Sequence, residues 1–383
     1  MKTYMFPGQG SQSKGMGGEL FDEYAELTAK ADKILGYSIK ELCLEDPKKQ
    51  LNKTQFTQPA LYVVNAFSYY KKIAELGTKP DYVIGHSLGE FNALLAAECF
   101  DFEAGLKLVK KRGELMSEVS DGGMAAILNA SKEQIEEILA TNNLTNIDLA
   151  NYNSPSQIVI SGLIEEIGEA QAFFQQGDIL YYPLNTSGAF HSRFMQPSKE
   201  KFQRYLNKFK LNDLNIPVIS NVTAVPYNND EVIRNLPEQI TSTVRWSDSV
   251  QYLLGLSADM EFEEIGNGDV LTKIVRTIKQ LTKNTSDQSL EGKSPVKKQM
   301  TASNKASKDK TDEKVVATDR TQVDILVNEW NQSHPVGTRV TSTLPEYDEL
   351  ETRTEAVVLF GHRAAVYMKG YNGYFDLNEL TSQ

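Results

Sequence analysis

One stretch near residue 85 constrains the fold of this 383-residue chain more than any other feature. Tyr82–Ile84 is a short apolar run typical of a buried strand, and Phe91–Ala97 contains helix formers with no helix breaker. The sequence GHSLG at residues 85–89, a G-x-S-x-G pattern, joins the two. Because a strand, a tight turn and a helix form the repeating unit of an α/β sheet, we expect an α/β fold with Ser87 at the end of a strand.

Ser87 is the candidate nucleophile. The glycines on either side let the chain turn tightly and lift the serine hydroxyl off the edge of the sheet. The backbone N–H of Leu88 then points to the same place and can help to hold an oxyanion. A simple tight turn is the alternative interpretation of GHSLG, but a strand before it and a helix after it favour the nucleophile.

A serine hydroxyl needs a base, and the chain has four histidines: His86, His191, His334 and His362. The last two lie beyond a segment that we expect to be a linker. The side chain of His86 should diverge from that of its neighbour on the turn. Elimination therefore selects His191 as the base, although a lone histidine is more often structural.

The composition excludes several classes of protein. Lys and Arg total 40 against 51 Asp and Glu, and the resulting net charge of −11 argues against nucleic acid and anionic membranes as partners. Only Cys43 and Cys99 are present, without the spacing of a zinc site or a disulfide scaffold, so no metal is expected. With neither a membrane-length apolar run nor a signal peptide, we expect a cytoplasmic location.

The length indicates two or three domains. Residues 284–320 are rich in Lys, Ser, Thr and Asp and have no aromatic residue, so we expect a flexible linker between a domain at 1–283 and a small mostly-β module at 321–383. Within the first domain, strand and helix patterns alternate over about 123–188, which predicts a small inserted subdomain.

Six segments occur in an order and at a spacing that resemble malonyl-CoA:acyl-carrier-protein transacylases of fatty acid and polyketide synthesis. The likeness covers about residues 1–283. The segments are FPGQGSQ at 6–12, GHSLGE at 85–90, RGELM at 112–116, NSP at 153–155, AFH at 189–191 and GNGDVLT at 266–272.

This resemblance implies an α/β-hydrolase-like large subdomain with a ferredoxin-like small subdomain. It also implies a ping-pong acyltransferase. Ser87 takes malonyl from malonyl-CoA with His191 as base, and the phosphopantetheine thiol of an acyl carrier protein then takes the malonyl group. No separate cofactor is implied. A free-standing enzyme with an appended module suggests action in trans on a polyketide or fatty acid synthase.

The resemblance also assigns further site residues. The N–H groups of Gln9 and Leu88 would form the oxyanion hole, and the main-chain carbonyl of Gln239 would orient the histidine. Arg112 would bind the malonyl carboxylate, for which a guanidinium fork is suited. Met116 and Phe190 would bound the space around the α-carbon and favour malonyl over methylmalonyl.

Two other functions compete with this interpretation. A trans-acting acyl hydrolase of the same fold would clear stalled acyl groups from carrier proteins with the same serine and histidine, but it would not need Arg112. A catalytically dead scaffold would have lost the nucleophile or the base, and both are present. The role of residues 321–383, the carrier protein, the product and the oligomeric state stay open.

Overall fold

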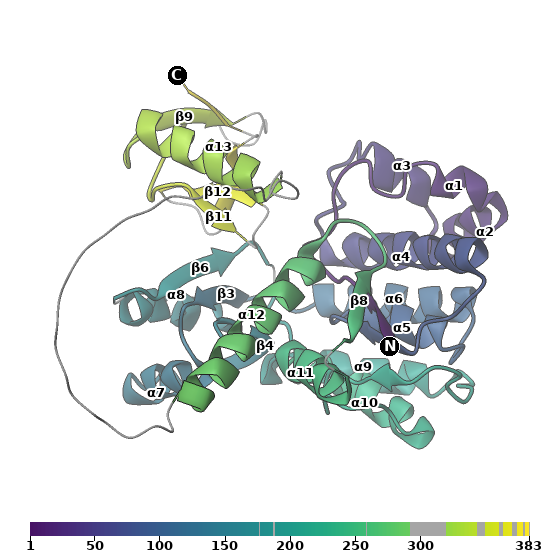
Figure 1. Ribbon diagram of the computed structural model, residues 1–383. Helices are drawn as coiled ribbons and strands as arrows, with labels where there is room; N and C mark the ends of the chain where they lie inside the picture. The colour runs from purple at the N-terminus through teal and green to yellow at the C-terminus, as the bar shows by residue number, and fades with distance from the viewer. Residues whose placement is uncertain are drawn as a thin grey trace, which may run out of the picture. The chain divides into compact units, whose positions relative to one another are not determined.

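The computed structural model describes residues 1–175, 177–186, 188–257, 259–291, 319–342, 349–359, 363–369, 374–377 and 380–382. The chain forms two compact units, Met1–Ile278 and Lys279–Gln383, which are described separately. The first unit consists of a large and a small subdomain (Figure 1).

The large subdomain is built on a parallel sheet of order β7-β2-β1-β8. Its strands are β1 (Lys2–Phe6), β2 (Tyr82–Gly85), β7 (Val218–Ile219) and β8 (Glu261–Glu264). Alternate residues of β1 face opposite ways, as a strand requires. The rings of Tyr4 and Phe6 contact Tyr69, whereas Met5 joins the apolar core formed with α11 (Trp246–Leu256) and α12 (Val270–Glu291). Helices therefore cover both faces of the sheet.

The remaining helices of the large subdomain surround this sheet. They are α1 (Leu20–Glu23), α2 (Ala25–Leu35), α3 (Ile39–Leu44), α4 (Thr54–Leu76), α5 (Gly89–Ala96), α6 (Phe102–Ser117), α9 (Gln196–Leu206) and α10 (Val232–Glu238). Two of them are tied directly to the predicted site. Helix α5 begins at Gly89, the last residue of the GHSLG turn. Helix α6 carries Arg112 and is preceded by the N-cap residue Asp101, whose side chain accepts a hydrogen bond from the backbone N–H of Ala104.

The small subdomain is an antiparallel sheet of order β4-β5-β3-β6 carrying two helices. Its elements are β3 (Gly122–Leu128), α7 (Lys132–Thr141), β4 (Ile147–Ser154), β5 (Gln157–Leu163), α8 (Ile164–Phe174) and β6 (Leu180–Leu184). This β-α-β-β-α-β order is ferredoxin-like, as the resemblance implied. An apolar core between the sheet and both helices includes Ile127, Ile135, Ile158, Ile167 and Phe174.

The expected linker begins later than the composition suggested. Helix α12 continues through residues 284–291, where neither glycine nor proline interrupts it. Residues 292–318, which make up most of the expected linker, lie outside the described residues.

In residues 319–382, the described part of the second unit comprises a helix and two small antiparallel sheets, of order β10-β9-β14 and β11-β12-β13. Its elements are α13 (Asp319–Ser333), β9 (Arg339–Ser342), β10 (Glu349–Glu351), β11 (Val357–Leu359), β12 (Arg363–Tyr367), β13 (Tyr374–Asp376) and β14 (Leu380–Ser382). Val340, Leu350 and Val366 belong to its apolar core.

The described residues lack two features that would point to other classes of protein. No helix in these ranges is long and apolar enough to span a bilayer. Nor do three or more His, Cys, Asp or Glu side chains gather there into a group that could hold a metal ion.

Candidate active site

Ser87 lies on the turn between β2 and α5, with a backbone φ of 51°. This left-handed conformation is unusual for a residue other than glycine and is typical of a serine lifted out of a sheet. The neighbouring glycines have no room for a side chain. A Cβ on Gly85 would lie 1.9 Å from the carbonyl carbon of Gly89, and a Cβ on Gly89 would lie 2.0 Å from the Phe6 oxygen. Leu88, the residue next to the nucleophile, is the N-cap of α5.

The structure brings Ser87, His191 and Gln239 into one line of hydrogen bonds. Ser87 Oγ lies 2.8 Å from His191 Nε2, and His191 Nδ1 lies 2.8 Å from the main-chain oxygen of Gln239. A carbonyl oxygen can only accept, so Nδ1 carries the proton and Nε2 is left with the lone pair that faces the serine. The imidazole thus has the tautomer that a general base needs.

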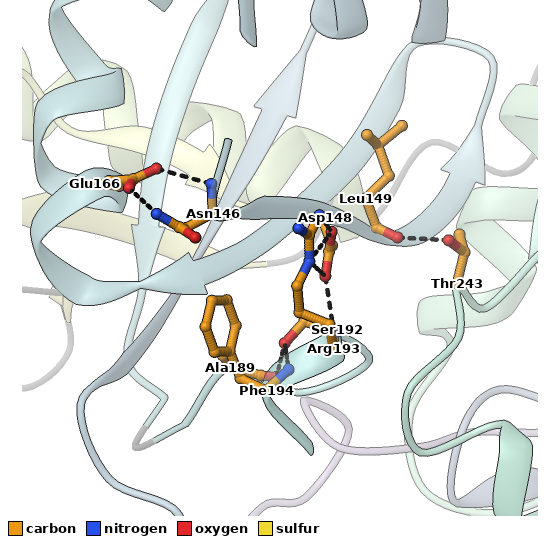
Figure 2. A network of polar contacts seen from close by, with 9 residues as sticks. All are labelled: Asn146, Asp148, Leu149, Glu166, Ala189, Ser192, Arg193, Phe194 and Thr243. Carbon is orange, nitrogen blue, oxygen red and sulfur yellow. Dashed lines mark hydrogen bonds and ion pairs between the residues drawn. The ribbon is translucent and has the colours of Figure 1, made fainter. Parts of the chain in front are cut away.

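The turn that carries His191 is held from both ends. The backbone φ of His191 is 59°, again left-handed. The Ser192 hydroxyl donates to the Ala189 carbonyl at 2.6 Å. Arg193 then reaches across to Asp148 on β4: its backbone N–H donates at 2.8 Å, and its guanidinium contacts both carboxylate oxygens, with Nε at 3.0 Å (Figure 2). A strained residue is therefore positioned by the small subdomain as well as by its own loop.

The edge of β4 that does not pair with β5 also contacts the large subdomain. The backbone N–H of Val244 donates to the Ala150 carbonyl at 2.9 Å, and its carbonyl accepts from the Tyr152 N–H at 2.9 Å. Thr243 Oγ1 donates to the Leu149 carbonyl (Figure 2). The loop after Gln239 thus extends the small sheet by one parallel bridge.

The other histidines point elsewhere. The half-buried ring of His86 packs against that of Trp246, and its Nε2 lies 2.8 Å from Asn153 Oδ1 on β4. His334 stacks on Trp330 in the second unit. His362 lies outside the described residues.

Arg112 on α6 is a fully buried cation at the nucleophile. Its Nη2 donates to Ser87 Oγ at 3.1 Å and to Gln239 Oε1 at 2.7 Å, and its Nη1 donates to Gln58 Oε1 at 2.7 Å. The guanidinium carbon lies 5.7 Å from the centroid of the Phe91 ring. A guanidinium has five N–H groups, of which these bonds use three, and the buried Nε has no partner among the described residues.

Burial and this cation determine the titration of the base. Burial, and next the Arg112 charge, lower the pKa of His191 to about 3. Burial lowers the pKa of Arg112 to about 10, so it stays charged near neutral pH. The site therefore holds a neutral imidazole beside a permanent cation, which suits a base that waits for a serine proton.

Gln9 lies on the loop after β1, packed against the GHSLG turn. A Cβ on Gly8 would lie 2.4 Å from the His86 carbonyl oxygen, so only glycine permits this approach. The side chain of Gln9 accepts from Thr54 Oγ1 at 2.8 Å and from Gln58 Nε2 at 3.2 Å. These bonds fix the loop next to the nucleophile, where the resemblance implied an oxyanion hole.

Met116 and Phe190 are both buried. Met116 lies one turn after Arg112 on α6, and its sulfur accepts from Gln58 Nε2 at 3.5 Å, so it borders the arginine network. Phe190 directly precedes the base, and a Cβ on Gly188 would lie 3.0 Å from its ring. Their expected role around the α-carbon of the substrate stays a prediction.

Three polar residues of the site received no role from the sequence: Gln58, Glu90 and Asn221. Asn221 accepts from the Ser87 N–H at 2.7 Å and donates to the Gly85 carbonyl at 2.7 Å, so it holds the turn. The sequence contained a signal for two of these residues, Gln58 and Asn221. Gln58 precedes an apolar run in a helix, and Asn221 follows a short strand at the sheet edge where parallel strands place ligand-binding residues.

Comparison with known proteins finds a matching family and close relatives. A family model described as acyl transferase domain matches residues 3–325. The chain is 56% identical over 282 residues to the polyketide biosynthesis malonyl CoA-acyl carrier protein transacylase PksC of Bacillus subtilis, covering 73% of this chain and 98% of that protein.

Two solved structures have a similar fold. A malonyl CoA-acyl carrier protein transacylase from Burkholderia pseudomallei aligns with a TM-score of 0.72 and 58% identity, over 73% of this chain and 98% of that one. A malonyl-transacylase solved in complex with a type II polyketide synthase acyl-carrier protein, PlMCAT with AntF, aligns with a TM-score of 0.68 and 31% identity, over 72% and 92%.

Proposed function

The chain belongs to the acyl transferase family, and on that premise we propose that it moves malonyl from malonyl-CoA to the phosphopantetheine thiol of an acyl carrier protein. One observation carries the proposal: Ser87 Oγ lies 2.8 Å from His191 Nε2 and 3.1 Å from Nη2 of the buried Arg112 guanidinium. A nucleophile, a base and a carboxylate-binding cation thus meet at one atom.

In the first half-reaction His191 Nε2 takes the proton as Ser87 Oγ attacks the thioester carbonyl. The N–H groups of Leu88 and Gln9 bind the developing oxyanion. The tetrahedral intermediate collapses with release of the CoA thiolate, which receives the proton from His191. The malonyl group is then an ester on Ser87, with its carboxylate on Arg112.

In the second half-reaction the carrier-protein thiol gives its proton to His191, and its sulfur attacks the ester carbonyl. Collapse returns the proton to Ser87 Oγ and leaves a malonyl thioester on the carrier. The exchange of ester for thioester involves no oxidation or reduction, so we propose that no separate cofactor takes part.

Arg112 also favours transfer of malonyl over hydrolysis of unsubstituted acyl groups. A hydrolase that clears such groups has no carboxylate to bind, yet this chain buries a cation at its nucleophile. The relatives named for polyketide biosynthesis support service to a polyketide synthase in trans, in the cytoplasm.

The test is intact-protein mass spectrometry after mixing the full chain with malonyl-CoA. We expect the mass to rise by one malonyl group in the wild type and to stay unchanged in Ser87→Ala, with loss of the adduct when a holo-carrier protein is added. Persistence of the adduct in the variant would refute Ser87 as the nucleophile. Release of the malonyl group as free malonate without carrier protein would favour the hydrolase.

A further inference from the structure

Glu90 is a carboxylate with no solvent exposure, three residues after the nucleophile on the first turn of α5. Its Oε1 accepts from the Asn221 N–H at 2.8 Å and from the Tyr227 hydroxyl at 2.9 Å. Its Oε2 accepts from Gln239 Nε2. A charged group this deep is retained only where its hydrogen bonds are satisfied, and neither half-reaction makes use of it.

Gln239 connects this carboxylate to the site. Its Nε2 donates to the Ser87 carbonyl at 2.8 Å and to Glu90, while its Oε1 accepts from Arg112 Nη2 at 2.7 Å. A carbonyl only accepts and a guanidinium only donates, so these partners permit one orientation of the amide. The same residue offers its main-chain oxygen to His191.

Glu90 is also the anion that acts on the Arg112 cation. Burial lowers the pKa of the arginine, and the Glu90 charge opposes that shift. Other ionisable groups surround the pair: Tyr227 bonds to the carboxylate, and His191 faces the guanidinium. Beyond them, Cys99 lies near the tyrosine and His86 near the base.

We propose that Glu90 is a positioning residue for malonyl selectivity. It holds the side-chain amide of Gln239 in the orientation that presents Arg112 to the substrate carboxylate, and it balances the arginine charge whenever that carboxylate is absent. The inference rests on the proposed function, because it takes malonyl to be the group that Arg112 binds.

Glu90→Gln tests this role with almost no change of shape. Asn221 and Tyr227 both donate, so they hold the new amide oxygen and turn its NH₂ group toward the NH₂ group of Gln239. Two donors then face each other. Reversing Gln239 does not help, because its oxygen would face the Ser87 carbonyl and its NH₂ group would face Arg112.

The experiment measures acylation of the full chain by malonyl-CoA and by acetyl-CoA, as kcat/KM for each. We expect Glu90→Gln to lower the malonyl-to-acetyl ratio by about tenfold or more, mainly through the malonyl value. Glu90→Asp keeps the charge but shortens the side chain, so its ratio should lie between those of Glu90→Gln and the wild type.

A pH series gives a readout that a merely structural role would not move. Burial raises the pKa of Glu90 to about 7, so the wild-type ratio should fall as the pH drops from 8 to 6 and the carboxylate takes a proton. Glu90→Gln should remove this dependence. The wild-type measurements need no variant, so they test the role of Glu90 even where Glu90→Gln fails to fold.

Glu264→Gln is the matched control. Glu264 is a half-buried glutamate that accepts from the backbone N–H groups of Leu271 and Thr272 at 3.1 and 2.8 Å, and it has no contact with Arg112 or Gln239 among the described residues. Its variant should keep the wild-type ratio.

The outcomes separate the two proposals. An unchanged ratio in Glu90→Gln, an equal loss with both thioesters, or a wild-type ratio that is flat between pH 8 and 6 would overturn the role of Glu90 alone. Failure of the wild type to accept malonyl on Ser87 would overturn the proposed function itself.

Discussion

Arg193 and Asp148 form a forked ion pair between the loop that carries the base and the strand at the edge of the small subdomain. The arginine side chain is 58% exposed and the aspartate side chain 23% exposed. Exposure limits what such a pair adds to stability, so its main effect is on the position of His191, two residues away.

We therefore expect Arg193→Ala to slow acylation of Ser87 by about tenfold, because small displacements of a base are costly. The same variant should lower the free energy of unfolding by no more than about 1 kcal/mol. A double-mutant cycle with Asp148→Ala, read by acylation rate and by urea denaturation, separates the two effects. Arg234→Ala, which breaks an exposed ion pair with Glu231, is the control. A wild-type rate in Arg193→Ala would contradict a positioning role.

Arg112→Ala should depress kcat/KM for malonyl-CoA by at least about 10², since the carboxylate loses two charge-assisted hydrogen bonds of about 1.5–3 kcal/mol each. Acetyl-CoA should gain in relative terms. Steady-state rates with both thioesters and a carrier protein as acceptor measure this change. Lys111→Ala alters the neighbouring cation, which is partly exposed, and should leave the ratio as in the wild type. Unaltered malonyl kinetics in Arg112→Ala would favour the hydrolase.

His191→Ala should slow both half-reactions by about 10² to 10⁴. In the wild type, the pKa of His191 is lowered to about 3, so the base is already neutral at pH 5. Acylation by acetyl-CoA, which needs no carboxylate binding, should therefore stay level from pH 5 to 8 and fall only in more acidic solution. Rapid-quench mass spectrometry can follow it. A decline centred near pH 6.5 would mean that the histidine titrates as an exposed one does.

Phe190→Ser should open space next to the base and improve methylmalonyl-CoA relative to malonyl-CoA. The gain should be modest, because one methyl group is worth about 1–3 kcal/mol of discrimination. Competition between the two thioesters for Ser87, read by adduct mass, gives the ratio. If it does not move, the Phe190 ring faces away from the α-carbon.

The sequence predicted those parts of the site whose signals are local. The GHSLG pattern depends on backbone geometry that only glycine permits at residues 85 and 89, so the pattern, together with the strand before it and the helix after it, predicted Ser87 as the nucleophile. His191 followed because the chain offers only four histidines. The strand and helix pattern over 123–188 predicted the small subdomain for a similar reason: its elements are short and consecutive along the chain.

The contacts that assemble the site were beyond such reasoning. Glu90 and Gln239 are 149 residues apart, and Glu90 and Asn221 are 131 apart. The local sequence around either partner does not predict these contacts, because only tertiary packing brings the residues together. The first part of the expected linker is helical for another physical reason: residues 284–291 are polar but contain neither glycine nor proline, so their composition does not stop α12 from continuing through them.

The contacts of strand β4 limit how the small subdomain can be exchanged between related enzymes. One edge of the strand pairs with β5, and the other is bonded by Val244. Asp148 meets Arg193 and Asn153 meets His86 along the same strand. A chimaera that imports the small subdomain alone would carry half of each of these pairs. The transplantable cassette therefore consists of four discontinuous pieces, which must come from the same parent: the subdomain, the turn around residue 86, and the loops around residues 191–193 and 243–244.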